Sequence, residues 1–155
     1  MTGFDLGTVG FPSPERLLPH KAPMVLIDEI SAWDGSCVVV RARVRARQLI
    51  VVDGLTSTLM CIEYMAQAVG CAEGLLRRAE GTPAVHRGLL LGTREAVFDV
   101  GMIAVGEELT ISATSRFSGA RMASYACNVV CGTKRVAHAE LNVYVGDDAE
   151  KNTGE

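Results

Sequence analysis

The sequence has 155 residues, a length typical of one domain that is large enough to bury a core. Hydrophobic residues make up 48% of the chain and charged residues 21%, the composition of an ordinary globular protein. The formal net charge of −3 excludes a generally basic nucleic-acid-binding protein and leaves other partners open.

The cysteine content favours a reducing compartment. The chain has five cysteines, an odd number, and none of them forms a CxxC pair. The N-terminus lacks the basic-then-apolar form of a signal peptide, so we expect a cytoplasmic protein. Cys127 and Cys131 could be metal ligands, but no His-Cys cluster with zinc spacing accompanies them. We therefore expect no metal and no cofactor.

The first structured segment is predicted at residues 13–18. Ser13 is a good N-cap, Pro14 suits the first helical position, and an acid follows in the first turn. Pro19 ends this helix after about one turn. Residues 24–27 form a short apolar run that predicts a first strand, ending near residues 28–30.

Residues 37–47 carry the clearest strand pattern. After three valines the sequence alternates strictly, which predicts one face in the core and arginines on the other face. The four arginines are Arg41, Arg43, Arg45 and Arg47. We favour a solvated sheet face, because like charges on alternate positions keep a strand edge soluble. The alternative is a docking surface for an acidic ligand or protein.

Residues 53–78 predict one long helix that is apolar on nearly every face. The candidate N-caps are Asp53, Thr56 and Ser57. Such a helix belongs in a protein core or a membrane. Three polar residues, Glu63, Gln67 and Glu73, leave no uncharged run near the roughly 18 residues of a membrane span. The helix is therefore predicted to be buried, and its small residues would allow a neighbouring backbone to approach closely.

Four β-like runs follow the helix, at residues 88–98, 107–117, 121–131 and 134–145. Turn residues between them fit hairpin connections. The helical and strand parts are segregated, which predicts an α+β fold with an antiparallel sheet wrapped around the central helix. We expect one domain, with an ordered core at about residues 13–145 and a frayed polar tail.

Two separated motifs carry a family resemblance. Residues 17–28, LLPHKAPMVLID, resemble the opening motif of the FabZ and FabA class of 3-hydroxyacyl-[acyl carrier protein] dehydratases. Residues 62–68, IEYMAQA, are similar to the central-helix motif of that class, and residues 90–98 resemble its next strand. Within the superfamily, IEYMAQA followed by LLGTR resembles the ApeP-like branch associated with aryl polyene synthesis.

The resemblance implies a hotdog fold and dehydration of a 3-hydroxyacyl thioester to the trans-2-enoyl thioester. It also implies a dimer, with itself or with a related hotdog subunit, or a higher oligomer, with acyl tunnels at or near the subunit interface. The acyl group would arrive on acyl carrier protein or coenzyme A. One departure stands out: the main dehydratases carry a catalytic His in a GHFPG-type loop before the helix, and residues 52–57 here contain none.

The reaction requires a base for the C2 proton, an acid for the C3 hydroxyl and stabilisation of the thioester oxygen. Glu63, a carboxyl group on an apolar helix, is expected to have a raised pKa and to act as the acid. His20, within the first motif, is the candidate base, although a structural hydrogen bond is an equally open role. His86 in a polar loop and His138 in a strand suit the reaction less well.

Other residues have expected roles around this pair. The amides of Gly54 and Leu55, near the expected helix start, are candidate donors to the thioester oxygen. Gln67, one turn beyond Glu63, would orient that carboxyl group or line the tunnel. Asp53 could replace the missing loop His, although an N-cap is the simpler role. The arginine row, together with Lys21, Arg77 and Arg78, would steer an acidic carrier protein.

Two other functions remain open. A hotdog thioesterase would use the same helix acid to direct water at the thioester carbon. A non-catalytic subunit would bind acyl chains or complete the site of an active partner, because the pocket of a dimer can draw groups from two chains.

Overall fold

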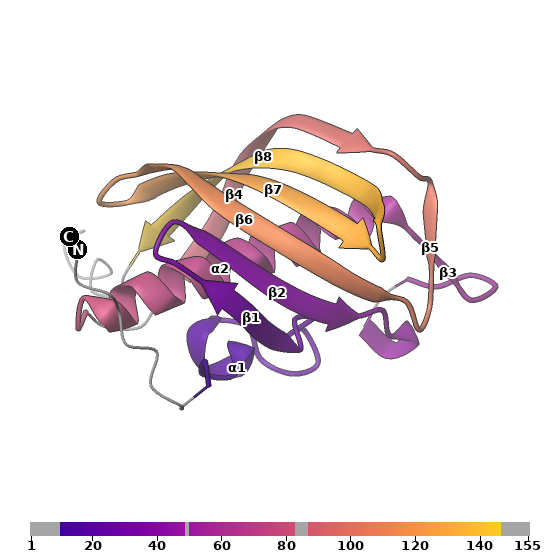
Figure 1. Cartoon of the computed structure of the whole chain (residues 1–155), viewed down its shortest axis with the longest axis horizontal. Helices are drawn as coiled ribbons and strands as arrows, with labels where there is room; N and C mark the ends of the chain where they lie inside the picture. Colours follow the sequence, from indigo (N-terminus) through magenta and orange to yellow (C-terminus); the bar gives the residue numbers. More distant parts are fainter. Residues whose placement is uncertain (1–9, 49, 83–86, 147–155) are drawn as a thin grey trace, which may run out of the picture.

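The computed structural model describes residues 10–48, 50–82 and 87–146. A six-stranded antiparallel sheet curves around one long helix, α2 (Cys61–Ala79), as Figure 1 shows. The strand order is β1-β2-β6-β7-β8-β4. The strands are β1 (Glu29–Trp33), β2 (Cys37–Arg43), β4 (Arg87–Phe98), β6 (Glu108–Ser118), β7 (Met122–Cys131) and β8 (Lys134–Gly146). The expected α+β fold is confirmed, and the last four predicted runs match β4, β6, β7 and β8 to within one residue at each end.

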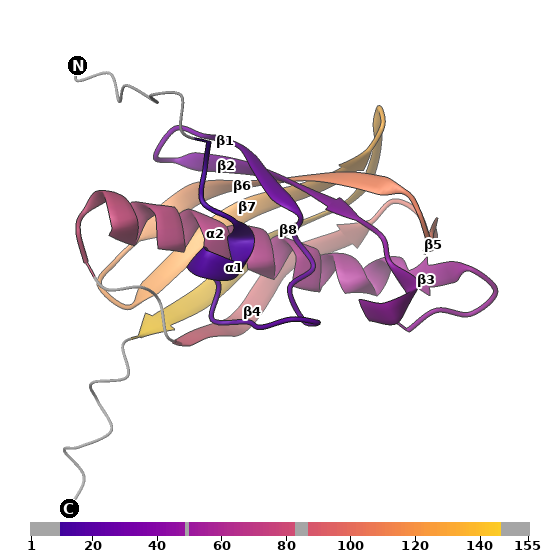
Figure 2. The same ribbon diagram turned by 90° about the horizontal axis from the view of Figure 1, so that it is seen from below.

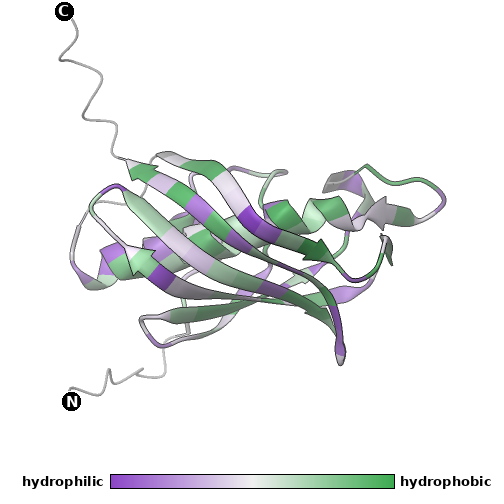
Figure 3. Cartoon of the chain, turned by 90° about the horizontal axis from the view of Figure 1, so that it is seen from above, coloured by the Kyte–Doolittle hydropathy of each residue, from purple (hydrophilic) through white to green (hydrophobic). Residues whose placement is uncertain are grey.

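The core lies between α2 and the sheet. Figure 2 shows α2 lying along one face of the sheet, with the small sheet of β3 (Leu55–Ser57) and β5 (Met102–Ala104) beyond its N-terminal end. Strand β6 alternates in burial, and its inward residues Leu109, Ile111 and Ala113 are fully buried. The hydropathy colouring in Figure 3 shows α2 to be largely hydrophobic and the sheet strands to be mixed. Burial of alternate strand residues against an apolar helix is the arrangement that the sequence pattern predicts.

The helical stretch Thr58–Ala79 is long and apolar enough to cross a membrane by length and composition alone. The expectation that its polar residues exclude a span was therefore too strict. In the fold, 61% of its apolar window is buried inside the protein. Packing against the sheet, rather than composition, identifies it as a core helix.

The short helix α1 (Pro14–Leu17) lies against α2, as predicted from its Ser-Pro start and Pro19 stop. Two glycines of α2 make room for this contact. A Cβ atom on Gly74 would lie 2.9 Å from Leu17 Cβ and 3.0 Å from the Leu17 carbonyl oxygen. A Cβ on Gly70 would lie 2.6 Å from Leu18 Cδ2. The small residues on α2 therefore allow the backbone of α1 to approach closely.

These two glycines give a matched pair of substitutions. Gly74→Ala is expected to lower the free energy of unfolding by up to about 2 kcal/mol, because the new methyl group meets backbone atoms that cannot rotate away. The overpacking itself costs about 1–3 kcal/mol, and alanine regains roughly 1 kcal/mol in helix propensity. Gly70→Ala meets only the end of a leucine side chain and should be nearly neutral. Urea unfolding measures both, and equal effects would contradict the explanation.

The first predicted strand is wrong. Residues 24–27 are not in a strand, because their backbone groups are hydrogen-bonded by a side chain of α2. Gln67 Oε1 accepts a bond from Leu26 N at 2.7 Å, and Gln67 Nε2 donates to Met24 O at 2.7 Å. Ladder pairing with β2 starts only where Asp28 N donates to Arg41 O, so β1 begins at Glu29.

The predicted second strand is four residues too long. Strand β2 ends at Arg43, and Ala46–Gln48 form a 3₁₀ turn. The Val44 amide donates a hydrogen bond to Glu107 O, in the turn before β6, and Val44 is not part of the strand. Arg45 and Arg47 therefore do not continue the strand face that carries Arg41 and Arg43.

The central helix begins later than predicted. Asp53 and Gly54 both have positive φ, 53° and 75°, and form a two-residue hairpin turn in which Val52 and Leu55 exchange backbone hydrogen bonds. This is the geometry that an Asp-Gly pair favours, so Asp53 is a turn residue and not an N-cap. Strand β3 and a 3₁₀ turn (Thr58–Met60) capped by Ser57 Oγ precede α2.

Candidate active site

A largely apolar pocket of about 150 Å³ lies between α2, the segment after α1, and strands β4 and β8. Its apolar wall is formed by Leu18, Ala66, Val69, Leu89, Leu90 and Val143. Its polar groups include His20 and Glu63, with Glu73 further along the helix. An apolar pocket with a few converging polar groups is the usual form of a small-molecule site.

His20 and Glu63 lie together at this pocket, although they are 43 positions apart in the sequence. His20 Nε2 is 3.4 Å from Glu63 Oε1, and the two side chains are 34% and 37% exposed. The distance is longer than a usual N–H···O hydrogen bond, so the pair is a loose, charge-assisted contact. The fold thus brings together the two residues that the sequence motifs single out.

Gln67 holds this pair in place. Its side chain is fully buried, and its Nε2 donates to Glu63 Oε1 at 2.8 Å. The same amide bonds to Met24 O and Leu26 N, in the segment that follows His20. One buried amide therefore connects the carboxylate of α2 to the segment that carries the histidine. The expected orienting contact between Gln67 and Glu63 is present.

The expected raised pKa of Glu63 is wrong. The contact with His20 is the main cause that holds the pKa of the Glu63 carboxyl group below its usual range, opposed by partial burial and supported by the Gln67 hydrogen bond. The helix is buried as predicted, but this position of the helix faces the pocket and is partly exposed. His20 Nδ1 is buried and has no hydrogen-bond partner among the described residues.

The lowered pKa of Glu63 gives a pH-dependent prediction. The carboxylate stabilises the fold above its unfolded-state pKa of about 4.3, and this contribution is lost as the pH falls through the lower folded-state pKa. The stability difference between the wild type and Glu63→Gln should therefore be present at neutral pH and shrink in acid. Urea unfolding across this pH range measures it. Glu95→Gln, at an exposed position of β4, is the control, and a difference for Glu63→Gln that stays constant with pH would contradict the role of the His20 contact.

Gly54 and Leu55 do not lie where a helix N-terminus would present their amides. The Leu55 amide donates to Val52 O within the hairpin, and Gly54 O accepts from Val105 N. Neither residue lines the pocket beside Glu63. Their expected position at the helix start is therefore wrong, because Gly54 belongs to the Asp-Gly turn and Leu55 to β3, and the 3₁₀ turn Thr58–Met60 lies between β3 and α2.

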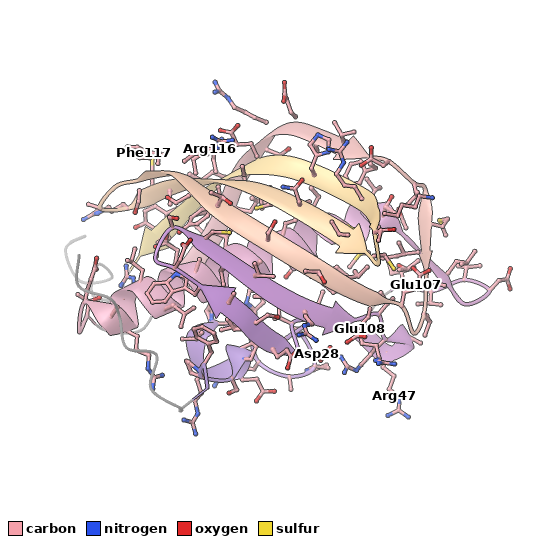
Figure 4. The ribbon with its side chains drawn as sticks, in the orientation of Figure 1. Asp28, Arg47, Glu107, Glu108, Arg116 and Phe117 are labelled. Carbon is pink, nitrogen blue, oxygen red and sulfur yellow. The ribbon has the colours of Figure 1, made fainter. Side chains whose placement is uncertain are left out.

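The arginine row is interrupted by acidic partners. Arg41 Nε lies 3.3 Å from Glu29 Oε1, and Arg45 Nη1 lies 2.6 Å from Asp28 Oδ1. Glu108 is the register partner of Arg43 in β6. Figure 4 shows Arg47 extending away from the sheet at the end where Asp28 and Glu108 lie. The surface is mixed in charge, which matches the favoured solvated sheet face more closely than a purely basic patch.

The remaining candidates do not join the pocket. His138 Nδ1 lies 3.9 Å from Asp99 Oδ2, and His86 is outside the described residues. Burial raises the pKa of Cys61 and of Cys71 to about 12, so these thiols stay protonated and are poor nucleophiles. In the part of the chain that the structure describes, no group of three or more His, Cys, Asp or Glu side chains could hold a metal ion.

One polar residue of the pocket was not assigned a role from the sequence. Glu73 was read only as an interruption of the apolar helix, yet it lines the same pocket as Glu63. The signal was the spacing of Glu63, Ala66, Gly70 and Glu73, which places all four on one helix face.

A sheet wrapped around one long helix, with a carboxylate on that helix beside an apolar pocket, defines a protein of the hotdog-fold class. A family model described as "ApeP-like: ApeP dehydratase" matches residues 12–153. The chain therefore belongs to the ApeP-like dehydratase family, as its motifs indicated.

Solved structures agree with this assignment. The dehydratase heterocomplex ApeI:P from Xenorhabdus doucetiae matches with a TM-score of 0.86 and 26% identity, covering 90% of this chain and 95% of that chain. A hypothetical thioesterase from Streptococcus pneumoniae TIGR4, solved with coenzyme A, matches with a TM-score of 0.60 and 17% identity, covering 76% and 84%. Escherichia coli PaaI, from the phenylacetic acid degradation operon, matches at 0.56 and 19%, covering 74% and 80%. The last two likenesses concern the fold alone. No curated protein sequence matches the chain.

Proposed function

We propose that the chain takes part in dehydrating 3-hydroxyacyl thioesters to trans-2-enoyl thioesters, in fatty-acid-like or aryl polyene biosynthesis. The observation that carries this proposal is the His20–Glu63 pair, 3.4 Å apart beside an apolar pocket, in a member of the ApeP-like dehydratase family. The pair supplies two proton-transfer groups, and the pocket supplies a place for the acyl chain.

Elimination of water moves two protons. A base takes the proton from C2, the electron pair forms the C2–C3 double bond, and the C3–O bond breaks as an acid protonates the departing hydroxyl. The lowered pKa of Glu63 keeps its carboxyl group ionised at neutral pH, so this carboxylate would accept the C2 proton and the neighbouring His20 would deliver a proton to the hydroxyl. This reverses the roles expected from the sequence, where Glu63 was the acid. Proton transfer between the two side chains then resets the pair.

The carrier and the partner subunit are also parts of the proposal. The acyl group would arrive on acyl carrier protein or coenzyme A in the cytoplasm. The row Arg41, Arg43, Arg45 and Arg47 would steer an acidic carrier by long-range attraction, although Glu29 and Asp28 offset part of its charge. Strand β4 is an edge of the sheet, and its residues Leu89, Leu90 and Leu91 are exposed in the single chain. A long apolar edge strand favours pairing with a second subunit, of the same or a related kind.

A second candidate is a subunit that completes the site of a catalytic partner. The residues 52–57 form a hairpin without a histidine, where the main dehydratases carry one. Ile50, Val52 and Leu59 around this hairpin are 82%, 65% and 64% exposed, so a partner could cover them. The similar structure from Xenorhabdus doucetiae is itself a dehydratase heterocomplex.

The experiment is a turnover assay with short 3-hydroxyacyl thioesters of acyl carrier protein and coenzyme A. Enoyl product and free thiol are measured together, with the purified chain alone and with a related hotdog subunit. Enoyl product from the chain alone supports the dehydratase proposal, and enoyl product only in the mixture supports the second candidate. Free thiol without enoyl product would point to a thioesterase instead.

A further inference from the structure

The far side of the pocket holds a buried polar pair that the dehydration chemistry does not use. Tyr125 of β7 donates a hydrogen bond of 2.6 Å to Glu73 Oε1 of α2. Glu73 is 7% exposed and Tyr125 3% exposed. Burial, and then the contact with Glu73, raise the pKa of Tyr125, so its hydroxyl stays protonated and donates to the carboxylate. A buried carboxylate costs stability unless it has partners, so this position calls for an explanation.

Glu73 stands at a defined distance from the reacting groups. It lies ten positions after Glu63 on the same helix face, which places the two about 15 Å apart along the axis. The pocket wall between them is made of small and apolar helix residues, Ala66, Val69 and Gly70. An acyl chain whose C2 and C3 lie at Glu63 and His20 would therefore extend along α2 toward Glu73.

The surroundings of Glu73 suit a polar group. A carboxylate offers about four acceptor positions, and the Tyr125 hydroxyl occupies one. Glu73 and Val145 also border a second hollow of about 440 Å³, which Thr82 and Ser118 line as well. A chain ending in a methyl group would remove water from the carboxylate without replacing its hydrogen bonds, whereas a chain ending in a hydroxyl could donate one.

We propose that Glu73 and Tyr125 form a distal subsite that selects acyl chains bearing a hydroxyl at the end remote from the thioester. The subsite rests on the proposed function in one respect, because that function places the thioester end of the ligand at Glu63 and His20. Glu73 accepts the hydrogen bond of the distal hydroxyl, and Tyr125 orients the carboxylate. No covalent step is involved.

The test is calorimetric binding of saturated acyl pantetheine thioesters to the full-length chain. The thioesters are compared in pairs of equal chain length, one ending in a methyl group and the other in a hydroxyl group. The chain lengths in the series span the roughly 15 Å between Glu63 and Glu73. The wild type should bind the hydroxyl-ended member about 10- to 100-fold more tightly at the best length, the usual range for a hydrogen bond to a charged group.

Three variants distinguish a subsite from a structural contact. Glu73→Leu combined with Tyr125→Phe removes both partners, which spares the fold an unpaired buried group, and should abolish or invert the preference. Tyr125→Phe alone keeps the acceptor but removes the hydroxyl that orients it, so it should weaken the preference without abolishing it. Ser124→Ala combined with Glu140→Leu removes another hydroxyl–carboxylate pair, outside the pocket, and should leave the preference unchanged. Circular dichroism checks that each variant is folded.

The outcomes separate the subsite from the reaction. Equal affinity for both thioesters, binding of neither, or a preference that survives in the Glu73→Leu, Tyr125→Phe double variant would overturn the subsite. A hydroxyl preference without enoyl product from the matching 3-hydroxyacyl thioesters would support the subsite and count against the dehydratase proposal. Enoyl product without any preference for the hydroxyl-ended thioester would support the dehydratase proposal and count against the subsite.

Discussion

Replacing Glu63 by glutamine should lower kcat for dehydration by about 100- to 10,000-fold, the usual contribution of a positioned acid or base. Glutamine has nearly the same shape and can still accept the hydrogen bond from Gln67, but it cannot take or release a proton. KM should change little, because the apolar wall of the pocket is intact. The rate of enoyl formation under saturating thioester gives kcat. The protein used is the assembly, either the chain alone or the chain with its partner subunit, that is active in the turnover assay.

Two further variants sharpen this result. His20→Ala removes the group 3.4 Å from Glu63 and should also lower kcat, and the double variant with Glu63→Gln should lose little more than either single change if the two act as a unit. Glu29→Gln, at an exposed position of β1 outside the pocket, is the control and should retain activity. Full enoyl formation by Glu63→Gln would refute the proposed mechanism.

Gln67→Leu should lower the free energy of unfolding by about 2–4 kcal/mol, a large effect for one side chain. Leucine has a similar volume but leaves the buried Leu26 amide and the Met24 carbonyl without their hydrogen-bond partner. Urea unfolding with two-state analysis measures the loss. Because the released segment follows His20, kcat should fall as well, with KM less affected.

The control for this change is Asn128→Leu, at a half-buried position of β7. Asn128→Leu should change stability by no more than about 0.5 kcal/mol, because the Asn128 side chain makes no hydrogen bond to the described part of the chain. Gln67→Leu with wild-type stability would show that the segment at residues 24–26 does not need the amide.

The candidate site followed from the sequence to a large extent. Glu63 and Gln67 are one helical turn apart, so their contact is a local consequence of helix geometry. His20 came from a motif and not from physical reasoning, because no local rule brings position 20 to position 63. The raised pKa of Glu63 was wrong for the same reason: the apolar helix pattern gives the burial of the helix, but not the histidine that approaches it from another segment.

The errors in secondary structure have a common physical origin. Residues 24–27 have a strand-like apolar pattern, but the amide of Gln67 binds two of their backbone groups and replaces the strand ladder. The residue types of Asp53-Gly54 are typical of a hairpin turn. The prediction nevertheless placed them in the helix, because the apolar helix pattern begins just after them. In each case the outcome depended on which of two competing hydrogen-bond arrangements the rest of the fold favours.

The sequence by itself determined the α+β class, the buried helix and the four C-terminal strands, because period and turn residues act over a few neighbouring positions. The motifs added the family. Only the tertiary structure decided the position of the pocket, the contact between His20 and Glu63, and the buried pairing of Glu73 with Tyr125. These contacts join residues 43 and 52 positions apart, and the packing of α2 against the sheet and α1 sets them, so no local pattern encodes them.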